Sequence, residues 1–243
     1  MSNSLWQSWG TSVIGPMHIK KGISNQDSWM SRQYKWGNVV VVSDGLGSKP
    51  HADHGSRAAC LAVFETAKTY KHNRHAEIKD ILRLIHANWL VKISPFSPYD
   101  CSSTCLFAIQ IEKKMILGQL GDGLITVHGD LPEKSFILNN RNPEFFSNMT
   151  YCLTGEFKYE QWKSITIKTE NCNSVILCTD GISDDLKESK ELDFTLEVAE
   201  HYKKHNARTR VTEIKKWLKE WPVPHHSDDK TIACLYRKEV CSE

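Results

Sequence analysis

The sequence predicts an α+β domain in which helices are layered on β-sheets. Short apolar segments rich in β-branched residues are typical of strands, whereas longer amphipathic segments are typical of helices. Along the chain the order is strands, two helices, several strands, further helices and a last strand. Strands and helices do not alternate regularly, which favours an α+β arrangement over a repeated βαβ unit.

The predicted strands are short and strongly apolar. They cover residues 38–43, 104–111, 114–120, 124–128, 174–179 and 231–236. Continuous apolar runs in Val39–Val42 and Val175–Cys178 indicate strands that are buried on both faces. The short gap between residues 114–120 and 124–128 predicts an antiparallel hairpin, with Asp122-Gly123 as its turn.

Four segments are predicted to be helical, and the clearest is residues 77–92. Apolar residues recur there at helical spacing and form one stripe: Ile78, Ile81, Leu82, Ile85 and Trp89. Residues 56–71, rich in alanine, and residues 194–204 are further helices. The last one is ended by Pro222 and carries Val211, Ile214, Trp217, Leu218 and Trp221.

Length and composition predict one domain over residues 1–243. The net charge of +2 is too balanced for a broad nucleic-acid footprint, and no apolar run approaches the ~20 residues of a membrane span. The chain shows no signal peptide, so its eight cysteines are expected to be reduced thiols in a cytoplasmic protein. Residues 130–160 have the least regular pattern and are a candidate flap.

Aspartates stand at the ends of the predicted strands. Asp44-Gly45 follows one buried strand and Asp180-Gly181 follows another, and neither has a partner strand that would explain it as a hairpin turn. The segment Ser227-Asp228-Asp229 precedes the last strand, Asp122 follows the strand at 114–120, and Asp27 precedes the first strong strand. Carboxylates gathered at strand ends repel one another, so their charge has to be balanced.

A hard divalent cation would balance these charges, because Mg²⁺ and Mn²⁺ prefer oxygen ligands. Gly45 fits such a site, since its bare backbone lets a carbonyl oxygen approach a metal closely. Two ions that share one carboxylate can also hold a bridging water and lower its pKa beside a phosphoryl group. The spacing of the aspartates therefore predicts an oxygen-ligated metal site.

Six short motifs along the chain resemble those of the metal-dependent protein phosphatases, the type 2C Ser/Thr phosphatases, and they occur in that family's order. They are NQD (25–27), VVSDGLGS (41–48), STCLFAI (103–109), GQLGDG (118–123), VILCTDGISD (175–184) and SDDKT (227–231). The opening segment is similar to a bacterial subgroup in which a histidine and a glycine precede Gln-Asp. The resemblance implies an α-β-β-α sandwich with two central, mainly antiparallel β-sheets.

The resemblance also implies roles for individual residues. Asp44 would bridge two Mn²⁺ or Mg²⁺ ions, and the carbonyl of Gly45 would bind the second. Asp180 and Asp228 would hold the first ion, and Asp122 together with Asp180 would hold a weaker third. Asp27 would order metal-bound water, so that Asp27 and Asp44 are the catalytic pair, and a bridging hydroxide would attack phosphorus directly.

The chain departs from the family at the groups that would handle substrate. Gly22 stands where many relatives have a phosphate-clamping arginine, and the candidates to replace it are Lys20, Lys21 and His18. Leu46 stands where some relatives have a histidine proposed as general acid, and His51 and His54 are nearby in sequence.

Two aspartates adjoin the matched positions. Asp185 and Asp229 are interpreted as solvated or capping groups, with a functional role as the alternative. Thr104 is expected to pack and to form hydrogen bonds rather than to take part in catalysis.

The expected function is a serine/threonine protein phosphatase acting on phosphoserine and phosphothreonine proteins, with a cognate Ser/Thr kinase as partner. The protein is expected to be a monomer that binds neither nucleic acid nor membrane. The alternative is a catalytically silent phosphatase fold that binds phosphoproteins or acts as a scaffold. Structural zinc is disfavoured, because no histidine pair (His51/His54, His201/His205 or His225/His226) is joined to a cysteine pair at finger spacing.

Overall fold

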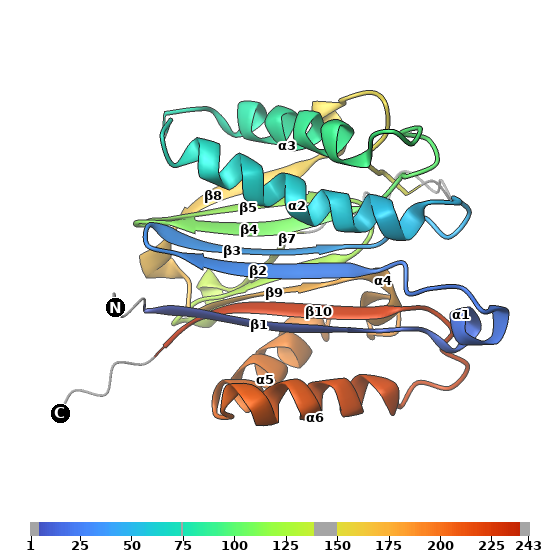
Figure 1. The fold of residues 1–243 in the computed structure, drawn as a ribbon. Coiled ribbons are helices and arrows are strands. Elements are labelled where there is room, and N and C mark those ends of the chain that lie inside the picture. The colour runs from blue at the N-terminus through green and yellow to red at the C-terminus, as the bar shows by residue number, and fades with distance from the viewer. Residues whose placement is uncertain (1–4, 74, 139–149, 239–243) are drawn as a thin grey trace.

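Two β-sheets lie face to face, and helices cover both outer faces (Figure 1). The computed structural model describes residues 5–73, 75–138 and 150–238. Each sheet has five strands, and every strand pair within them is antiparallel. The predicted α+β class and the four-layer α-β-β-α sandwich are therefore confirmed.

The first sheet is covered by two long helices. In spatial order its strands are β2 (Ser28–Tyr34), β3 (Gly37–Ser43), β4 (Cys105–Ile111), β5 (Lys114–Leu120) and β8 (Lys163–Lys168). The helices on its outer face are α2 (Ala52–Tyr70) and α3 (Ile78–Ile93). Trp89 of α3 is fully buried, and its indole Nε1 donates a hydrogen bond to the carbonyl of Gly55 in α2 at 3.1 Å, which ties the two helices together.

The second sheet carries the other helical layer. Its strands are β1 (Trp6–Val13), β10 (Lys230–Arg237), β9 (Ser174–Cys178), β6 (Leu124–His128) and β7 (Phe136–Leu138). Helices α5 (Glu191–Lys203) and α6 (Ala207–Lys219) cover its outer face. The remaining described helices are short: α1 (Pro16–Lys21), α4 (Asp180–Ser183), η1 (Pro132–Lys134), η2 (Tyr159–Gln161) and η3 (Thr169–Asn171).

The apolar strands are buried on both faces because each sheet lies between a helical layer and the other sheet. In β3, Val39 and Val41 pack against the helices, whereas Val40 and Val42 pack into the core between the sheets. Alternate side chains of a strand point to opposite faces, so a continuous apolar run serves both cores. β9 shows the same division, as its apolar sequence predicts.

The predicted hairpin at residues 114–128 is wrong. β5 pairs with β4 and β8 in one sheet, whereas β6 pairs with β7 and β9 in the other. Both edges of β5 are already occupied, and Gly121, with φ of +110°, turns the chain across to the second sheet. Asp122 therefore lies in a crossover between the sheets and not in a hairpin turn.

The four predicted helices are confirmed, with two corrections in the last of them. Helix α6 ends at Lys219, so Trp221 is buried beyond its end and not on the helix. In α3 the residues of the predicted stripe lie against the first sheet, and Ile81, Leu82 and Ile85 are buried. In α6, Ile214 and Leu218 are buried but Val211 is 48% exposed, so the apolar face is narrower than predicted. Among the described residues, no helix is both long enough and apolar enough to cross a membrane.

The candidate flap at residues 130–160 lies partly outside the described residues. The part before residue 139 forms η1 and β7, and the part from residue 150 on returns to the first sheet, where Leu153 bridges to Ser103. Residues 139–149 are not described, so the flap stays a prediction. All seven cysteines in the described part of the chain are free, and six of them are buried.

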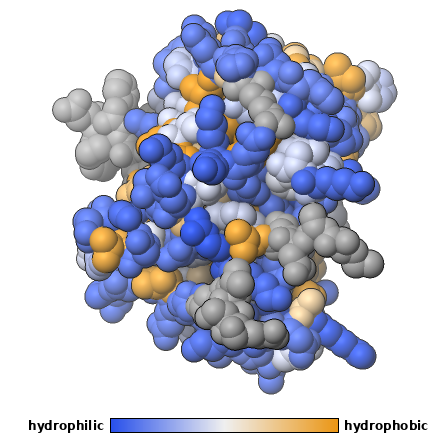
Figure 2. Space-filling view, turned by 90° about the vertical axis from the view of Figure 1, so that its left-hand side faces the viewer, coloured by the Kyte–Doolittle hydropathy of each residue, from blue (hydrophilic) through white to orange (hydrophobic). Residues whose placement is uncertain are grey.

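One end of the sandwich lies where β1 begins and β10 ends. Figure 2 looks onto this end and shows a mainly hydrophilic surface with separate hydrophobic patches. A groove of about 700 Å³ lies here, and its lining includes Trp6, Trp36 and Arg237. The predicted metal ligands all lie at the opposite end.

Candidate metal centre

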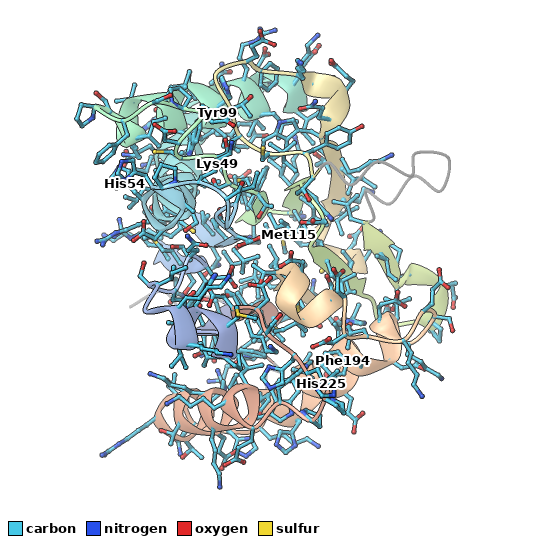
Figure 3. The ribbon with its side chains drawn as sticks, turned by 90° about the vertical axis from the view of Figure 1, so that its right-hand side faces the viewer. Lys49, His54, Tyr99, Met115, Phe194 and His225 are labelled. Atoms are coloured by element: carbon cyan, nitrogen blue, oxygen red, sulfur yellow. The ribbon has the colours of Figure 1, made fainter. Side chains whose placement is uncertain are left out.

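The strand ends of both sheets bring the predicted aspartates together. A cavity of about 310 Å³ is lined by Asp44, Gly45, Asp122, Asp180 and Asp228. It lies at the end of the sandwich that carries α1 and α4, which faces the viewer in Figure 3.

Asp27 does not line this cavity, but its side chain is close to it. The side chain is 6% exposed, and its charge acts on both Asp44 and Asp180. All six predicted metal-site residues are therefore gathered at one place.

Asp44 is fixed by a short ladder to the start of β4. Its backbone N–H donates to the hydroxyl of Thr104 at 2.8 Å, and the N–H of Thr104 donates to the carbonyl of Asp44 at 2.7 Å. The hydroxyl of Ser43 donates to the Thr104 carbonyl at 2.6 Å. Thr104 therefore forms hydrogen bonds that hold the aspartate loop, as its position in the sequence predicts.

Gly45 is required by close packing and not by an unusual backbone angle. A Cβ at this position would lie 2.2 Å from the carbonyl oxygen of Ala52 at the start of α2. The N–H of Gly45 donates to the carbonyl of Gln26 at 3.1 Å, which ties the loop to the segment before Asp27. The same packing that demands a glycine also holds the loop against α2.

Gly45→Ala is expected to displace this loop and to weaken metal binding and activity. The Cβ meets backbone atoms, which cannot rotate away, so a loss of about 1–3 kcal/mol in unfolding free energy is expected. Gly155→Ala is the matched control, because its Cβ would meet only Pro98, at 3.9 Å. Chemical denaturation of both variants and Mn²⁺ titration calorimetry would check this. Wild-type metal affinity in Gly45→Ala would contradict it.

Two carboxylate oxygens of the site have no hydrogen-bond partner although they are buried. Asp27 accepts a bond on Oδ2 from the hydroxyl of Thr179 at 2.7 Å, but its Oδ1 is left without a partner. Asp122 accepts a bond on Oδ2 from the hydroxyl of Thr150 at 2.6 Å, and its Oδ1 is likewise unpartnered. Buried polar atoms normally find partners, so these oxygens point to groups that bind there.

Burial raises the pKa of three carboxyls of the site, and the negative charges of neighbouring site aspartates add to this at Asp44 and Asp180. Burial raises the pKa of Asp27 to about 6, against the lowering effect of hydrogen bonds from Thr231 and Thr179. Burial, together with the negative charges of Asp122 and Asp228, raises the pKa of Asp180 to about 8. The pKa of Asp44 lies well above its usual value, because it is buried and faces Asp27, Asp180 and Asp228. A bound cation would reverse all of these shifts.

The donor set fits hard divalent cations. The predicted ligands are carboxylates and one glycine carbonyl, which are the oxygen ligands that Mg²⁺ and Mn²⁺ take. No cysteine is among the described residues that line the cavity, and the histidine that lines it, His18, contacts Asp229 through Nδ1. No three of these carboxylates have oxygens that all lie within 4.8 Å of one another in the described chain. A single ion held directly by three of them therefore fits poorly, whereas ions that keep several waters fit well.

The structure corrects the interpretation of Asp229. Its side chain is 1% exposed, so it is not a solvated group. Its carboxylate accepts hydrogen bonds from the backbone N–H groups of Gly15 and Gln26, both at 2.7 Å, and contacts His18 Nδ1 at 2.9 Å. Asp185 is half-buried and accepts a bond from the indole of Trp221 at 2.7 Å, so it too is not simply solvated.

The three candidates for the phosphate-binding role differ in whether they line the acidic cavity. His18 lines the cavity. Lys20 and Lys21 are exposed in the last turn of α1 and do not line it, because α1 is a short helix that presents only part of its circumference to the cavity. Sequence distance placed all three near Asp27, but only the fold distinguishes them.

The two histidines near Asp44 in sequence are turned away from the cavity. His51 and His54 pack on Phe96, with ring centroids 4.0 and 5.1 Å from the phenyl ring. Figure 3 shows His54 at the side of this end formed by α2, far from His225 on the side of α6. Leu46 does line the cavity, so the histidine position of some relatives is apolar here.

Lys230 is a buried cation beside the site that the sequence interpretation did not consider. Its side chain is 1% exposed, and Nζ donates to the carbonyl of Asp228 at 3.1 Å and lies 3.0 Å from His226 Nδ1. Burial lowers the pKa of this lysine, and the surrounding aspartates act against that lowering. The sequence offered one sign of this buried cation, because Lys230 stands next to an apolar strand that is predicted to be buried.

Of the histidine pairs weighed for zinc, one acquires a third potential ligand. His201, His205 and Glu213 have ligand atoms within 4.8 Å of one another, at the α5–α6 turn away from the acidic cavity. His205 forms an ion pair with Glu213 at 3.0 Å.

The fold and the site together define a layered α-β-β-α protein with a cation-attracting acidic centre at one end of the sandwich. Comparison with family models gives a match to "Protein phosphatase 2C" over residues 14–221. The chain therefore belongs to the protein phosphatase 2C family. A comparison with curated protein sequences found no significant match.

Solved structures of this family have a similar fold. The catalytic domain of the serine/threonine phosphatase PstP, in complex with two manganese ions, is 14% identical with a TM-score of 0.61, covering 96% of this chain and 99% of that one. Stp1 from Staphylococcus aureus is 13% identical with a TM-score of 0.63, covering 97% and 96%. A phosphatase 2C from Toxoplasma gondii is 11% identical with a TM-score of 0.65, covering 96% and 95%.

Proposed function

We propose that the protein is a metal-dependent serine/threonine protein phosphatase that hydrolyses phosphomonoesters at a binuclear Mn²⁺ or Mg²⁺ site. The observation that carries this proposal is the acidic cavity. Asp122, which lines it, and Asp27, which lies close to it, each have a buried carboxylate oxygen, Oδ1, without a partner in the described chain. Membership of the phosphatase 2C family and the manganese ions bound by PstP support it.

The residues proposed to bind the ions are the aspartates and the glycine that line the cavity. Asp44 and the carbonyl of Gly45 would hold one ion. Asp180 and Asp228 would hold the other together with Asp44, in part through bound waters, and Asp122 would add to a weaker third. When bound, the ions supply Lewis-acid chemistry: they lower the pKa of water and neutralise phosphate charge. Asp27, fixed by Thr179, would orient the attacking water.

Two properties of the chain disfavour cysteine-based catalysis and metal-free phosphate binding. Six of the seven described cysteines are buried, and burial raises the thiol pKa at Cys60 and Cys178, so these thiols are poor nucleophiles. The acidic cavity cannot bind a phosphate dianion unless cations first reverse its charge. Cation binding is therefore expected to precede substrate binding.

Hydrolysis of a phosphothreonine peptide by chelator-treated protein, titrated with Mn²⁺ and then Mg²⁺, tests this proposal. Turnover should be absent without metal and should appear with Mn²⁺ or Mg²⁺. The proposal also includes phosphoserine and phosphothreonine proteins as substrates and a Ser/Thr kinase that opposes this activity. It includes a monomeric state as well.

The silent phosphoprotein-binding module remains the second candidate. It is favoured by one observation: no lysine or arginine is among the described residues that line the cavity, and Gly22 replaces the expected arginine. Calorimetry separates the two candidates. Metal binding without turnover on any phosphorylated substrate would favour the module, and absence of metal binding would contradict the phosphatase.

A further inference from the structure

The acidic cavity contains a single basic side chain among the described residues that line it, and that side chain is His18. It belongs to α1, the short helix at this end of the sandwich. Its side chain is 14% exposed, so the imidazole is largely enclosed. A histidine enclosed at this place is a candidate proton donor, because an imidazole nitrogen can carry a proton to a leaving oxygen.

The ring of His18 is held in one orientation. Nδ1 lies 2.9 Å from Asp229 Oδ2, and a carboxylate only accepts, so Nδ1 carries the hydrogen. Asp229 is itself immobilised, since Gly15 N–H donates to its Oδ1 and Gln26 N–H donates to its Oδ2. With Nδ1 engaged, Nε2 is the nitrogen of His18 left to act in the cavity.

The helix that carries His18 is attached to the metal-ligand segment. The N–H of Met17 donates to the carbonyl of Ser227 at 3.0 Å. Gly15 packs so closely on Asp228 that a Cβ there would lie 2.3 Å from the Asp228 carbonyl carbon. His18 is therefore held beside one of the proposed metal ligands by backbone contacts that leave little freedom.

We infer that His18 is a catalytic residue that donates a proton from Nε2 to the leaving oxygen of a phosphoserine or phosphothreonine, and that Asp229 is its positioning residue. This inference rests on the proposed function. An aspartate that holds the Nδ1–H tautomer and leaves Nε2 to transfer a proton is a familiar arrangement in hydrolases. It would supply here the proton donor that Leu46, His51 and His54 do not provide.

The step balances as a hydrolysis. A water oxygen forms a bond to phosphorus, and the bond from phosphorus to the serine or threonine oxygen breaks. The proton on Nε2 moves to that oxygen, so the product leaves as a neutral alcohol. The proton that the attacking water gives up to solvent is matched by one that His18 takes from solvent, which restores the imidazolium. No oxidant, reductant or further reactant is needed.

His18→Asn is the sharpest test of this role. The asparagine amide occupies the place of Nδ1 and keeps a donor for Asp229, but nothing replaces Nε2. Loss of a general acid typically costs about 10²–10⁴-fold, so kcat on a phosphothreonine peptide should fall by about 10²-fold or more. On p-nitrophenyl phosphate, whose nitrophenolate leaves without a proton, kcat should change by less than about threefold.

Two further variants separate proton donation from other roles. His18→Gln places an amide N–H near the position of Nε2, so a hydrogen bond survives but no proton can be transferred, and the same selective loss is expected. Asp229→Asn should also lower the ratio of peptide to nitrophenyl turnover, which a merely loosened fold would not change. His72→Asn is the matched control, an exposed histidine beyond the end of α2 that does not line the cavity and should leave both rates at wild-type values.

Three outcomes would overturn the inference. Equal losses on both substrates would mean that His18 only supports the site, and a rise in KM with kcat retained would mean that it only binds phosphate. Wild-type peptide turnover in His18→Asn would show that it has no catalytic role. These outcomes require an active wild-type enzyme. A wild type that hydrolyses neither substrate with Mn²⁺ would instead overturn the proposed function, and the inference with it.

Discussion

Replacing Asp44 with asparagine is expected to abolish metal-dependent turnover while leaving the metal-free protein at least as stable as the wild type. Asp44 is largely buried among Asp27, Asp180 and Asp228, and these neighbours and its burial hold its pKa well above the usual range. Ionising this carboxyl in the folded, metal-free protein is therefore unfavourable, by about 1.4 kcal/mol for each unit of pKa shift. Asparagine has nearly the same shape but carries no charge.

Activity and stability should thus move in opposite directions in this variant. Turnover should fall by at least about 10²-fold, since the residue proposed to bridge two cations is lost. Unfolding free energy of the chelated protein, measured by denaturant titration at neutral pH, should hold or rise. Asp80→Asn is the control, because Asp80 is an exposed acid in the first turn of α3, where its ion pair with Arg83 and its position at the helix N-terminus should make its loss slightly destabilising. A clear loss of stability in metal-free Asp44→Asn, beyond the slight loss in the control, would argue against a repulsive metal site.

The strands that the sequence predicts are the central ones, and those it does not predict are the sheet edges. β1 and β7 form the edges of one sheet, and β2 and β8 form the edges of the other. An edge strand has one neighbour, and much of β2 and β8 is accessible to water, so these strands mix polar with apolar residues. Apolar periodicity detects burial on both faces and therefore detects the inner strands best.

The failed hairpin has a related cause. Local sequence shows that two strands follow each other closely, but it does not show which edges are already occupied. β5 is enclosed by β4 and β8, and β8 joins it from residues 163–168, far along the chain. The choice of partner is a tertiary property, so the Asp-Gly pair at residues 122–123 was interpreted as a turn although it crosses between sheets.

The site was predictable where strand ends carry the chemistry, and unpredictable where the fold brings distant segments together. Asp44 and Asp180 follow buried strands without a hairpin partner, which is visible in the sequence. Asp229 was interpreted as a solvated neighbour of Asp228, because its partners Gly15 and Gln26 are 214 and 203 residues away. Only the structure shows that this carboxylate joins the two ends of the chain at the metal centre.

The metal-free protein is expected to lose stability as the pH rises from about 6.5 to 8. A carboxyl whose pKa is raised in the folded state binds more protons folded than unfolded, so unfolding free energy falls as pH passes through the raised value. Asp180, with a pKa raised to about 8, acts in this window, and burial and the neighbouring aspartates also hold the pKa of Asp44 well above its usual value. Each carboxyl contributes a slope of at most about 1.4 kcal/mol per pH unit.

The window begins at about pH 6.5 because an opposite effect operates below it. Burial lowers the pKa of His128 to about 4, so the unfolded state binds the extra proton there, and that histidine makes the protein more stable as pH rises toward 6.5. Asp27, with a pKa raised to about 6, acts in the other direction over much of the same range. The effects of His128 and Asp27 on the unfolding free energy partly cancel below pH 6.5. The range from pH 6.5 to 8 is therefore the better test of the acidic centre.

Comparing wild type with Asp180→Asn isolates the contribution of one carboxyl, because His128 and the other titrating groups are common to both proteins. Denaturant titrations of chelated protein at several pH values should show a shallower fall between pH 6.5 and 8 in the variant. Saturating Mn²⁺ should flatten the wild-type profile as well, since bound cations hold the carboxylates ionised and stabilise the folded state by mass action. A chelated wild type whose stability stays constant or rises across this window would show that the carboxylates do not repel one another as the structure requires.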